Sequence, residues 1–150
     1  MIHLHRTTAD NPDFKKLVDR LNRDLASRHG ADHPLAQFNP VDDLKYVLVA
    51  YDKQQRALGC GAIGRHDPET MEIKRMYVRP EARGQRLGKR ILTELEQWTL
   101  ELKSTKSILF MGVKQPEATR LYERMGYRQI PKYRKLGEIE ECVCLAKTLA

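Results

Sequence analysis

The fourteen residues 79–92, RPEARGQRLGKRIL, gather five basic side chains and two glycines. A strand-like segment precedes them and a helical pattern follows. Several unpaired backbone N–H groups would therefore lie at the start of a helix, at the positive end of its dipole. Gly84 and Gly88 would let the backbone bend, or let a ligand come close without a Cβ in the way. This chemistry suits a phosphorylated ligand held by main-chain amides, or a nucleic acid held by a basic face. A tight turn followed by a helix with a solvated basic face is the third interpretation.

The nucleic-acid interpretation requires a feature that this stretch lacks. Single-stranded nucleic acid is usually bound by basic groups interleaved with aromatic side chains on which the bases stack. Residues 79–90 contain no aromatic residue. The formal net charge of +7 favours anionic partners but does not identify them. We therefore expect no nucleic-acid partner, and a basic nucleic-acid-binding domain is kept as an alternative.

The elements around this stretch predict one domain, residues 1–150, with a mixed sheet flanked by helices. Apolar residues recur at helical spacing from Pro12 to a stop at Gly30, over residues 87–102, and over 115–126. Alternating, β-branched or aromatic runs predict the strands. The expected strands are MIHLHRTT (1–8), KYVLVAY (45–51), ALGCGAIGR (57–65), MEIKRMYV (71–78), SILFMGV (107–113), YRQI (127–130) and ECVCLAKTL (141–149).

The fourth expected strand changes parity part-way along its length. Met71 and Ile73 are odd-numbered, whereas Met76 and Val78 are even-numbered, so a regular strand cannot put both pairs on one face. One extra residue, at Lys74 or the arginine after it, would form a β-bulge and restore a common face. Alternatively, the strand is buried on both faces and its parity carries no information.

The order EIKRMYVRPEARGQRLGKRIL, followed by QPEATRLYERMGYRQI, resembles the GNAT superfamily of acyl-CoA-dependent N-acetyltransferases. The resemblance covers residues 45 to 130. In that family the pattern (Gln or Arg)-x-x-Gly-x-(Gly or Ala) follows the fourth strand and binds the coenzyme A pyrophosphate. Arg83 takes the first position and Gly88 the last, but Arg86 stands where the inner glycine is expected. The resemblance implies an α/β (α+β) fold with a mostly antiparallel sheet of about six to seven strands, a bulged fourth strand, and a cleft between the fourth and fifth strands.

The resemblance also implies how acetyl-CoA, the expected co-substrate, would bind. The main chain of residues 76–78 would pair with the pantetheine arm as an added strand would, and amides from Gly84 to Lys89 would hold the pyrophosphate. Gln115 stands where the family often has an asparagine. The expected cofactor-binding residues are therefore Met76, Tyr77, Val78, Arg83, Gly84, Gln85, Arg86, Leu87, Gly88, Lys89 and Gln115.

Two side chains are candidates for the proton transfers of such a reaction. An acceptor amine attacks a thioester only when neutral, yet a free alkyl amine has a pKa of about 10.4. Glu72, beside the expected bulge, is the candidate general base; alternatively it is an exposed strand residue paired with Lys74 or Arg75. Tyr122 matches the family tyrosine near the cofactor sulfur, and a tyrosine of pKa ~10 can protonate a thiolate whose acid has a pKa of ~8.5. Core packing is the alternative role for Tyr122.

The predicted function is transfer of an acetyl group from acetyl-CoA to a primary amine of a small molecule, amino acid or peptide, by direct attack in a ternary complex. A domain that binds acyl-CoA without catalysis is the remaining alternative, and Tyr122 counts against it. Residues 25–44 and 130–141 are expected to shape the acceptor pocket, but they contain no motif that identifies the acceptor.

Composition excludes several other classes. No apolar run is long enough to span a membrane, and the first eight residues lack the apolar core of a signal peptide. Three cysteines make no secreted disulfide framework, so we expect a cytoplasmic protein. His29 and His33 are four residues apart, but Gly30 and Pro34 interrupt a helix there and no third ligand is evident, so no metal is expected. The oligomeric state stays open, with a homodimer as the commonest closed assembly.

Overall fold

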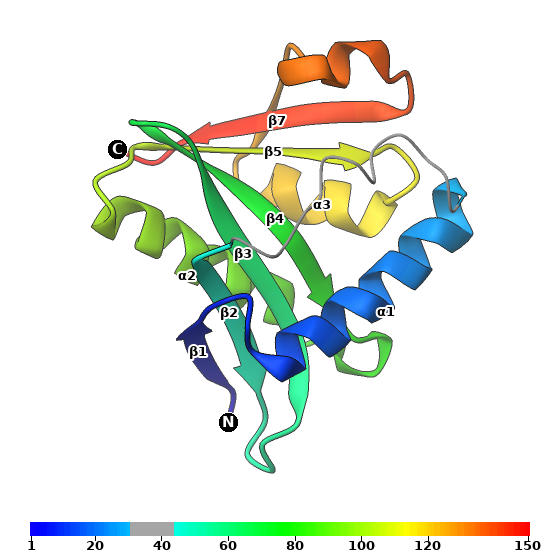
Figure 1. Cartoon of the computed structure of the whole chain (residues 1–150), viewed down its shortest axis with the longest axis vertical. Coiled ribbons are helices and arrows are strands. Elements are labelled where there is room, and N and C mark those ends of the chain that lie inside the picture. Colours follow the sequence, from blue (N-terminus) through cyan, green and yellow to red (C-terminus); the bar gives the residue numbers. More distant parts are fainter. Residues whose placement is uncertain (31–43) are drawn as a thin grey trace.

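The computed structural model describes residues 1–30 and 44–150, and Figure 1 shows a twisted sheet with helices on both faces. The strands of this sheet lie in the order β1-β2-β3-β4-β5-β7-β6. Neighbouring strands are antiparallel except β4 and β5, which are parallel. The predicted mixed, mostly antiparallel sheet is confirmed. Its strands are β1 (His3–Thr7), β2 (Tyr46–Tyr51), β3 (Ala57–Asp67), β4 (Thr70–Val78), β5 (Lys106–Gly112), β6 (Arg128–Ile130) and β7 (Cys142–Thr148).

The three α-helices of the described chain lie where the sequence predicts them. They are α1 (Pro12–His29), α2 (Leu87–Glu101) and α3 (Pro116–Arg124), and two short 3₁₀ helices are η2 (Pro80–Ala82) and η3 (Arg134–Glu138). In the two described ranges, no helix has the length and apolar character needed to cross a membrane. Residues 31–43 of the first segment expected to shape the acceptor pocket, with His33, lie outside the described residues.

Helix α1 covers one face of the sheet, and its ends follow from local chemistry. The Asn11 side chain accepts a hydrogen bond from the Phe14 N–H at 3.0 Å, and Pro12 occupies the first turn, where no N–H is needed. Gly30 ends the helix with a φ of +92°, which favours glycine. Phe14 and Leu17 of this helix are fully buried, in one cluster with Tyr77 of β4.

Helices α2 and α3 cover the opposite face. Ile91, Leu92 and Leu95 of α2 are fully buried against Met71 of β4 and other sheet residues. Tyr122 of α3 belongs to the same cluster. Strand β4 therefore lies between two apolar layers, and its position is fixed from both sides.

The predicted bulge in β4 is confirmed by the register of β4 against β3. Cys60 of β3 is opposite Tyr77, and Ala62 is opposite Lys74, so β4 uses one more residue than β3 over the same length. The backbone of Arg75 takes up the extra residue with a φ of +57°. After the bulge, Met76 and Val78 lie on the same face of β4 as Met71 and Ile73. All four side chains pack in the apolar cluster beneath α2.

Strands β4 and β5 separate soon after their pairing begins. Their parallel pairing runs from Thr70 opposite Lys106 to Glu72 opposite Ile108. Beyond this point, among the described residues, β5 pairs with β7 alone, on its other side, and Figure 1 shows β4 and β5 diverging toward α1 and α3. The edge of β4 that faces β5 is therefore left open over residues 73–78.

The close approach of β3 to β4 predicts that a methyl group at Gly59 disturbs this edge. A Cβ there would lie 2.8 Å from the Tyr77 carbonyl oxygen and 3.1 Å from Cδ1 of Ile91. We expect Gly59→Ala to lower the free energy of unfolding by about 1–3 kcal/mol in urea titrations. Gly64→Ala, in the same strand, is the matched control, because its nearest neighbours are 3.4 Å away. Equal stability changes in the two variants would contradict this steric account.

Candidate active site

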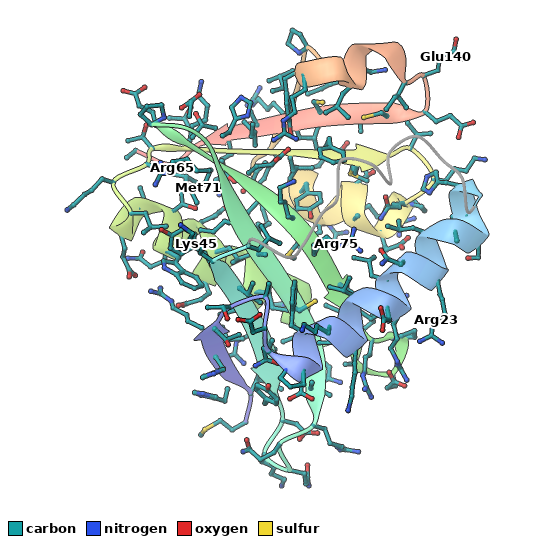
Figure 2. All side chains as sticks on the ribbon, viewed as in Figure 1. Arg23, Lys45, Arg65, Met71, Arg75 and Glu140 are labelled. Atoms are coloured by element: carbon teal, nitrogen blue, oxygen red, sulfur yellow. The ribbon has the colours of Figure 1, made fainter. Side chains whose placement is uncertain are left out.

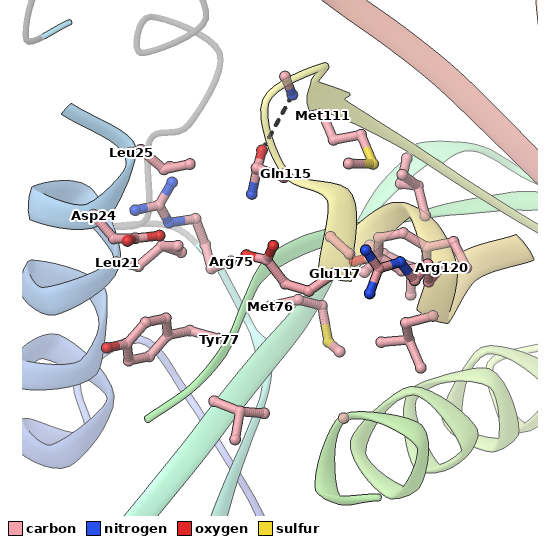
Figure 3. Close-up of a pocket in the computed structure, with 18 of the residues that line it drawn as sticks. Leu21, Asp24, Leu25, Arg75, Met76, Tyr77, Met111, Gln115, Glu117 and Arg120 are labelled. Atoms are coloured by element: carbon pink, nitrogen blue, oxygen red, sulfur yellow. Dashed lines mark hydrogen bonds between the residues drawn. The ribbon is translucent and has the colours of Figure 1, made fainter. Parts of the chain in front are cut away.

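A cavity of about 940 Å³ opens where β4 and β5 separate (Figure 3). Its walls come from α1, β4, the turn before α2, the end of β5, and α3. Among the residues predicted to bind the cofactor, Gln85 alone does not line it. Those that do are Met76, Tyr77, Val78, Arg83, Gly84, Arg86, Leu87, Gly88, Lys89 and Gln115.

The turn that precedes α2 exposes a row of backbone amides. Gly84 has a φ of +83°, and Arg86 has the left-handed values φ +60° and ψ 22°. Helix α2 begins at Leu87, and the Arg90 N–H donates to the Arg86 carbonyl at 3.1 Å. The amides of residues 87–89 therefore lie in the first turn, where a helix supplies no acceptors of its own. This is a site suited to an anion.

The left-handed backbone at Arg86 gives a physical reason for the glycine expected there. An L-residue in this conformation costs about 1–2 kcal/mol, whereas glycine adopts it without that cost. Arg86 nevertheless leaves its amide available, because the side chain does not change the backbone donor. The departure from the expected pattern is thus accommodated by the backbone.

Arg83 has a contact that its charge alone does not reveal. Its Nε donates to the Val78 carbonyl at 2.9 Å, and its guanidinium carbon lies 5.8 Å from the centre of the Tyr77 ring. The side chain thereby ties the turn to the end of β4. At Gly88 an added Cβ would lie 3.3 Å from Cδ2 of Leu121, so the start of α2 lies close against α3.

Tyr122 lines the cavity from α3 and is only 5% exposed. Its ring meets that of Tyr127 edge to face, with centroids 5.6 Å apart. Burial raises the pKa of the Tyr122 hydroxyl well above its ordinary value near 10. The hydroxyl stays protonated at neutral pH, as a general acid must, but the raised pKa also makes it a weaker proton donor toward a thiolate.

Gln115 caps the turn between β5 and α3. Its side-chain oxygen accepts a hydrogen bond from the Gly112 N–H at 3.2 Å, and Figure 3 shows its amide nitrogen directed into the cavity. One end of the amide therefore fixes the turn, while the other can contact a ligand.

The structure does not bring Glu72 into the cavity. Glu72 is 1% exposed, accepts a hydrogen bond from the Tyr133 hydroxyl at 2.7 Å, and forms ion pairs with Lys74 at 3.2 Å and with Arg134. The alternative interpretation of an exposed strand residue is wrong, although its pairing with Lys74 is confirmed. Lys74, its ion-pair partner, lines the cavity, whereas Glu72 does not.

Sequence reasoning missed an ion-pair network at the α1 end of the cavity. Arg28 of α1 binds Asp24 with an N–O distance of 3.2 Å and Glu117 of α3 with one of 2.6 Å. Both carboxylates line the cavity. The spacing of Asp24 and Arg28, four residues apart on one helix, could have indicated half of this network. Glu117 is distant in sequence, so no local pattern could have supplied the rest.

Residues 43–129 match the family model of the acetyltransferase (GNAT) domain. The chain belongs to the GNAT acetyltransferase family. An uncharacterized N-acetyltransferase of Schizosaccharomyces pombe is 33% identical over 132 residues, which cover 83% of this chain and 80% of that protein. An IAA acetyltransferase of Azospirillum brasilense is 31% identical over 117 residues, covering 75% and 74% of the two chains. The predictions of the family and of an acetyltransferase are confirmed.

Solved structures of this family share the fold over the whole chain. A Klebsiella pneumoniae structure assigned to the acyl-CoA N-acyltransferases is 26% identical, with a TM-score of 0.85 over 100% of this chain and 99% of that one. The PaiA N-acetyltransferase of Thermoplasma acidophilum, solved in complex with coenzyme A, is 14% identical, with a TM-score of 0.72 over 99% of each chain. The predicted fold class is confirmed.

Proposed function

We propose that this GNAT acetyltransferase transfers an acetyl group from acetyl-CoA to the primary amine of a small molecule or amino acid, by direct attack in a ternary complex. The observation that carries this proposal is one continuous cavity, which joins the amide-rich turn before α2 to Tyr122 through the gap between β4 and β5. A nucleic-acid-binding domain would need no such gap between two strands of its sheet.

Three features of the cavity suit coenzyme A. The amides of residues 84–89 would hold its pyrophosphate at the start of α2. The open edge of β4 at residues 76–78 would pair with the two amides of the pantetheine arm, as in strand addition. In the described chain the lining includes seven cationic side chains and two carboxylates, an excess that suits the coenzyme's phosphates.

The proposed reaction requires two proton transfers. The neutral amine nitrogen attacks the thioester carbonyl, the new N–C bond forms, and the C–S bond breaks as the electron pair leaves on sulfur. Tyr122 would donate its proton to that thiolate, and the acceptor nitrogen would lose one proton to a base. Backbone N–H groups near the bulge would stabilise the tetrahedral oxyanion.

Glu72 is the proposed base, in an indirect role. Glu72 is buried and paired with Lys74, so it cannot contact the amine directly. It would accept the amine proton through a relay of intervening groups. Glu117 is a second candidate, because its carboxylate lines the cavity and is partly exposed. The two candidates are separable by mutation.

The proposed function is tested by thiol release from acetyl-CoA with a panel of amines, amino acids and peptides. Release should be saturable and depend on the acceptor, and calorimetry should detect binding of coenzyme A. Binding of coenzyme A without acceptor-dependent release would support a domain that has lost catalysis. An absence of any binding heat would refute both readings.

Tyr122→Phe should lower kcat by at least tenfold and leave coenzyme A affinity within about twofold, because only the donated proton is lost. Tyr127→Phe is the matched control. The Tyr127 hydroxyl bonds Ser107 at 2.8 Å and Glu96 at 2.9 Å and does not line the cavity, so its loss should reduce stability more than turnover. Steady-state kinetics and calorimetry measure both effects. Wild-type turnover in Tyr122→Phe would remove it as the acid.

Glu72→Gln should lose rate mainly at low pH, where the acceptor is protonated and its deprotonation limits turnover. It should also lower the free energy of unfolding by roughly 1–3 kcal/mol, because Lys74 and the partly exposed Arg134 lose their shared partner. Rate against pH and urea unfolding separate the two effects. A wild-type pH profile in Glu72→Gln, with loss of low-pH rate in Glu117→Gln, would move the base to Glu117.

A further inference from the structure

Arg75 is a buried cation at the α1 end of the cavity, and its charge is not balanced there. The residue is 6% exposed, and Nη2 donates to Oδ1 of Asn22 on α1. Its Nε is buried and has no hydrogen-bond partner. Within residues 1–30 and 44–150, no carboxylate forms an ion pair with Arg75. Figure 3 shows its side chain extending from β4 toward α1 along the cavity wall.

The bulge places this side chain away from solvent. Figure 2 shows Arg75 inside the fold between β4 and α1, whereas Arg23 of α1 points outward. A guanidinium carries five N–H donors, and a buried charge without a partner is costly. Burial lowers the pKa of Arg75, which is the sign of this cost, yet an arginine stays protonated. A buried guanidinium without an anionic partner among the described residues indicates that the partner is supplied by a bound ligand.

That anion is distinct from the phosphates of coenzyme A. Arg83, Arg86 and Lys89 line the cavity at the turn before α2, where the amides would hold the pyrophosphate. Arg75 is three residues before the end of β4, roughly 10 Å along the strand at 3.3 Å per residue. The anion recognised by Arg75 therefore belongs to the second substrate.

The surroundings of Arg75 narrow the chemistry of that substrate. Arg28 already engages both carboxylates of the cavity, Asp24 and Glu117, so they form no ion pair with Arg75. The same end of the cavity is lined by the apolar side chains Leu21 and Leu25. A planar guanidinium matches a carboxylate with two parallel hydrogen bonds.

We propose that Arg75 binds the carboxylate of the acyl acceptor, and that the acceptor is an amino acid with an apolar side chain. This inference rests on the proposed acetyl transfer to an amine and names the class of acceptor. Arg75 would contact the substrate directly, while Asn22 would position its guanidinium. The amine would then lie between this anchor and the thioester.

The test compares two acceptors that differ only in the carboxylate, leucine and 3-methylbutylamine, in the wild-type enzyme and in Arg75→Gln. The variant should lose at least tenfold in kcat/KM for leucine, the range for a lost hydrogen bond to a charged group. Its kcat/KM for 3-methylbutylamine should stay within threefold. Because each acceptor is compared with itself, the different amine pKa values cancel.

Three controls separate substrate recognition from a structural role. Arg75→Gln should melt at the same or a higher temperature than the wild type and keep its coenzyme A affinity, because a buried unpaired charge is removed. Arg23→Gln, on the exposed side of α1, should change neither acceptor. Calorimetry of leucine added to the complex with coenzyme A measures recognition without turnover, and Arg75→Gln should abolish that binding.

The outcomes separate this inference from the function on which it rests. Equal losses for both acceptors in Arg75→Gln would overturn the carboxylate role, even with acetyl transfer intact. Wild-type use of leucine by Arg75→Gln would overturn it as well. If no amine is acetylated, the proposed function fails, but leucine binding in the calorimeter still tests the role of Arg75. Leucine binding that is lost in Arg75→Gln supports the carboxylate anchor, and an absence of leucine binding to the wild type refutes it.

Discussion

The site depends on the early end of pairing between β4 and β5. In a regular sheet the backbone groups of β4 beyond Glu72 would be bonded to β5 and covered. Because β5 instead completes its pairing with β7, it remains anchored on one edge while its other edge is free. The free edges form a gap that α1, α2 and α3 cover with side chains rather than with backbone bonds. A cavity through the centre of a sheet is thus compatible with a stable core.

The bulge at Arg75 and the turn at Gly84–Arg86 serve the same gap in different ways. The bulge consumes one residue without advancing the strand, and this keeps the apolar residues after it beneath α2. It also directs an arginine toward α1 instead of into that apolar layer. The turn uses two positive φ angles to bring the first amides of α2 to the end of β4. Conformations that cost energy are therefore concentrated where a ligand would lie, and this is common at functional sites.

Local patterns in the sequence were enough for most of the fold and for half of the site. Helix caps at Asn11 and Gly30, strand runs, and the parity change in β4 are all short-range signals, and each corresponds to what the structure has. The turn before α2 carries its signal within a few residues. The α1 wall was predictable only in part, because Asp24 and Arg28 lie one turn apart on the same helix, whereas Glu117 meets Arg28 only through tertiary packing. Burial of Glu72 depends in the same way on Tyr133 and Arg134, which are 61 and 62 residues further along the chain.

The ion pairs of Glu72 show which C-terminal residues the domain needs in order to fold. The family match stops at residue 129, yet η3 supplies Arg134 to the centre of the sheet, and β7 pairs with β5 along its whole length. Removing the last twenty residues would expose the edge of β5 and take the Tyr133 and Arg134 partners from the buried Glu72 carboxylate beside the bulge, leaving it with Lys74. The smallest piece of this chain able to fold with an intact site is therefore longer than the segment by which its family is recognised. Residues after 129 lie beyond the family match, yet the sheet and the surroundings of Glu72 depend on them.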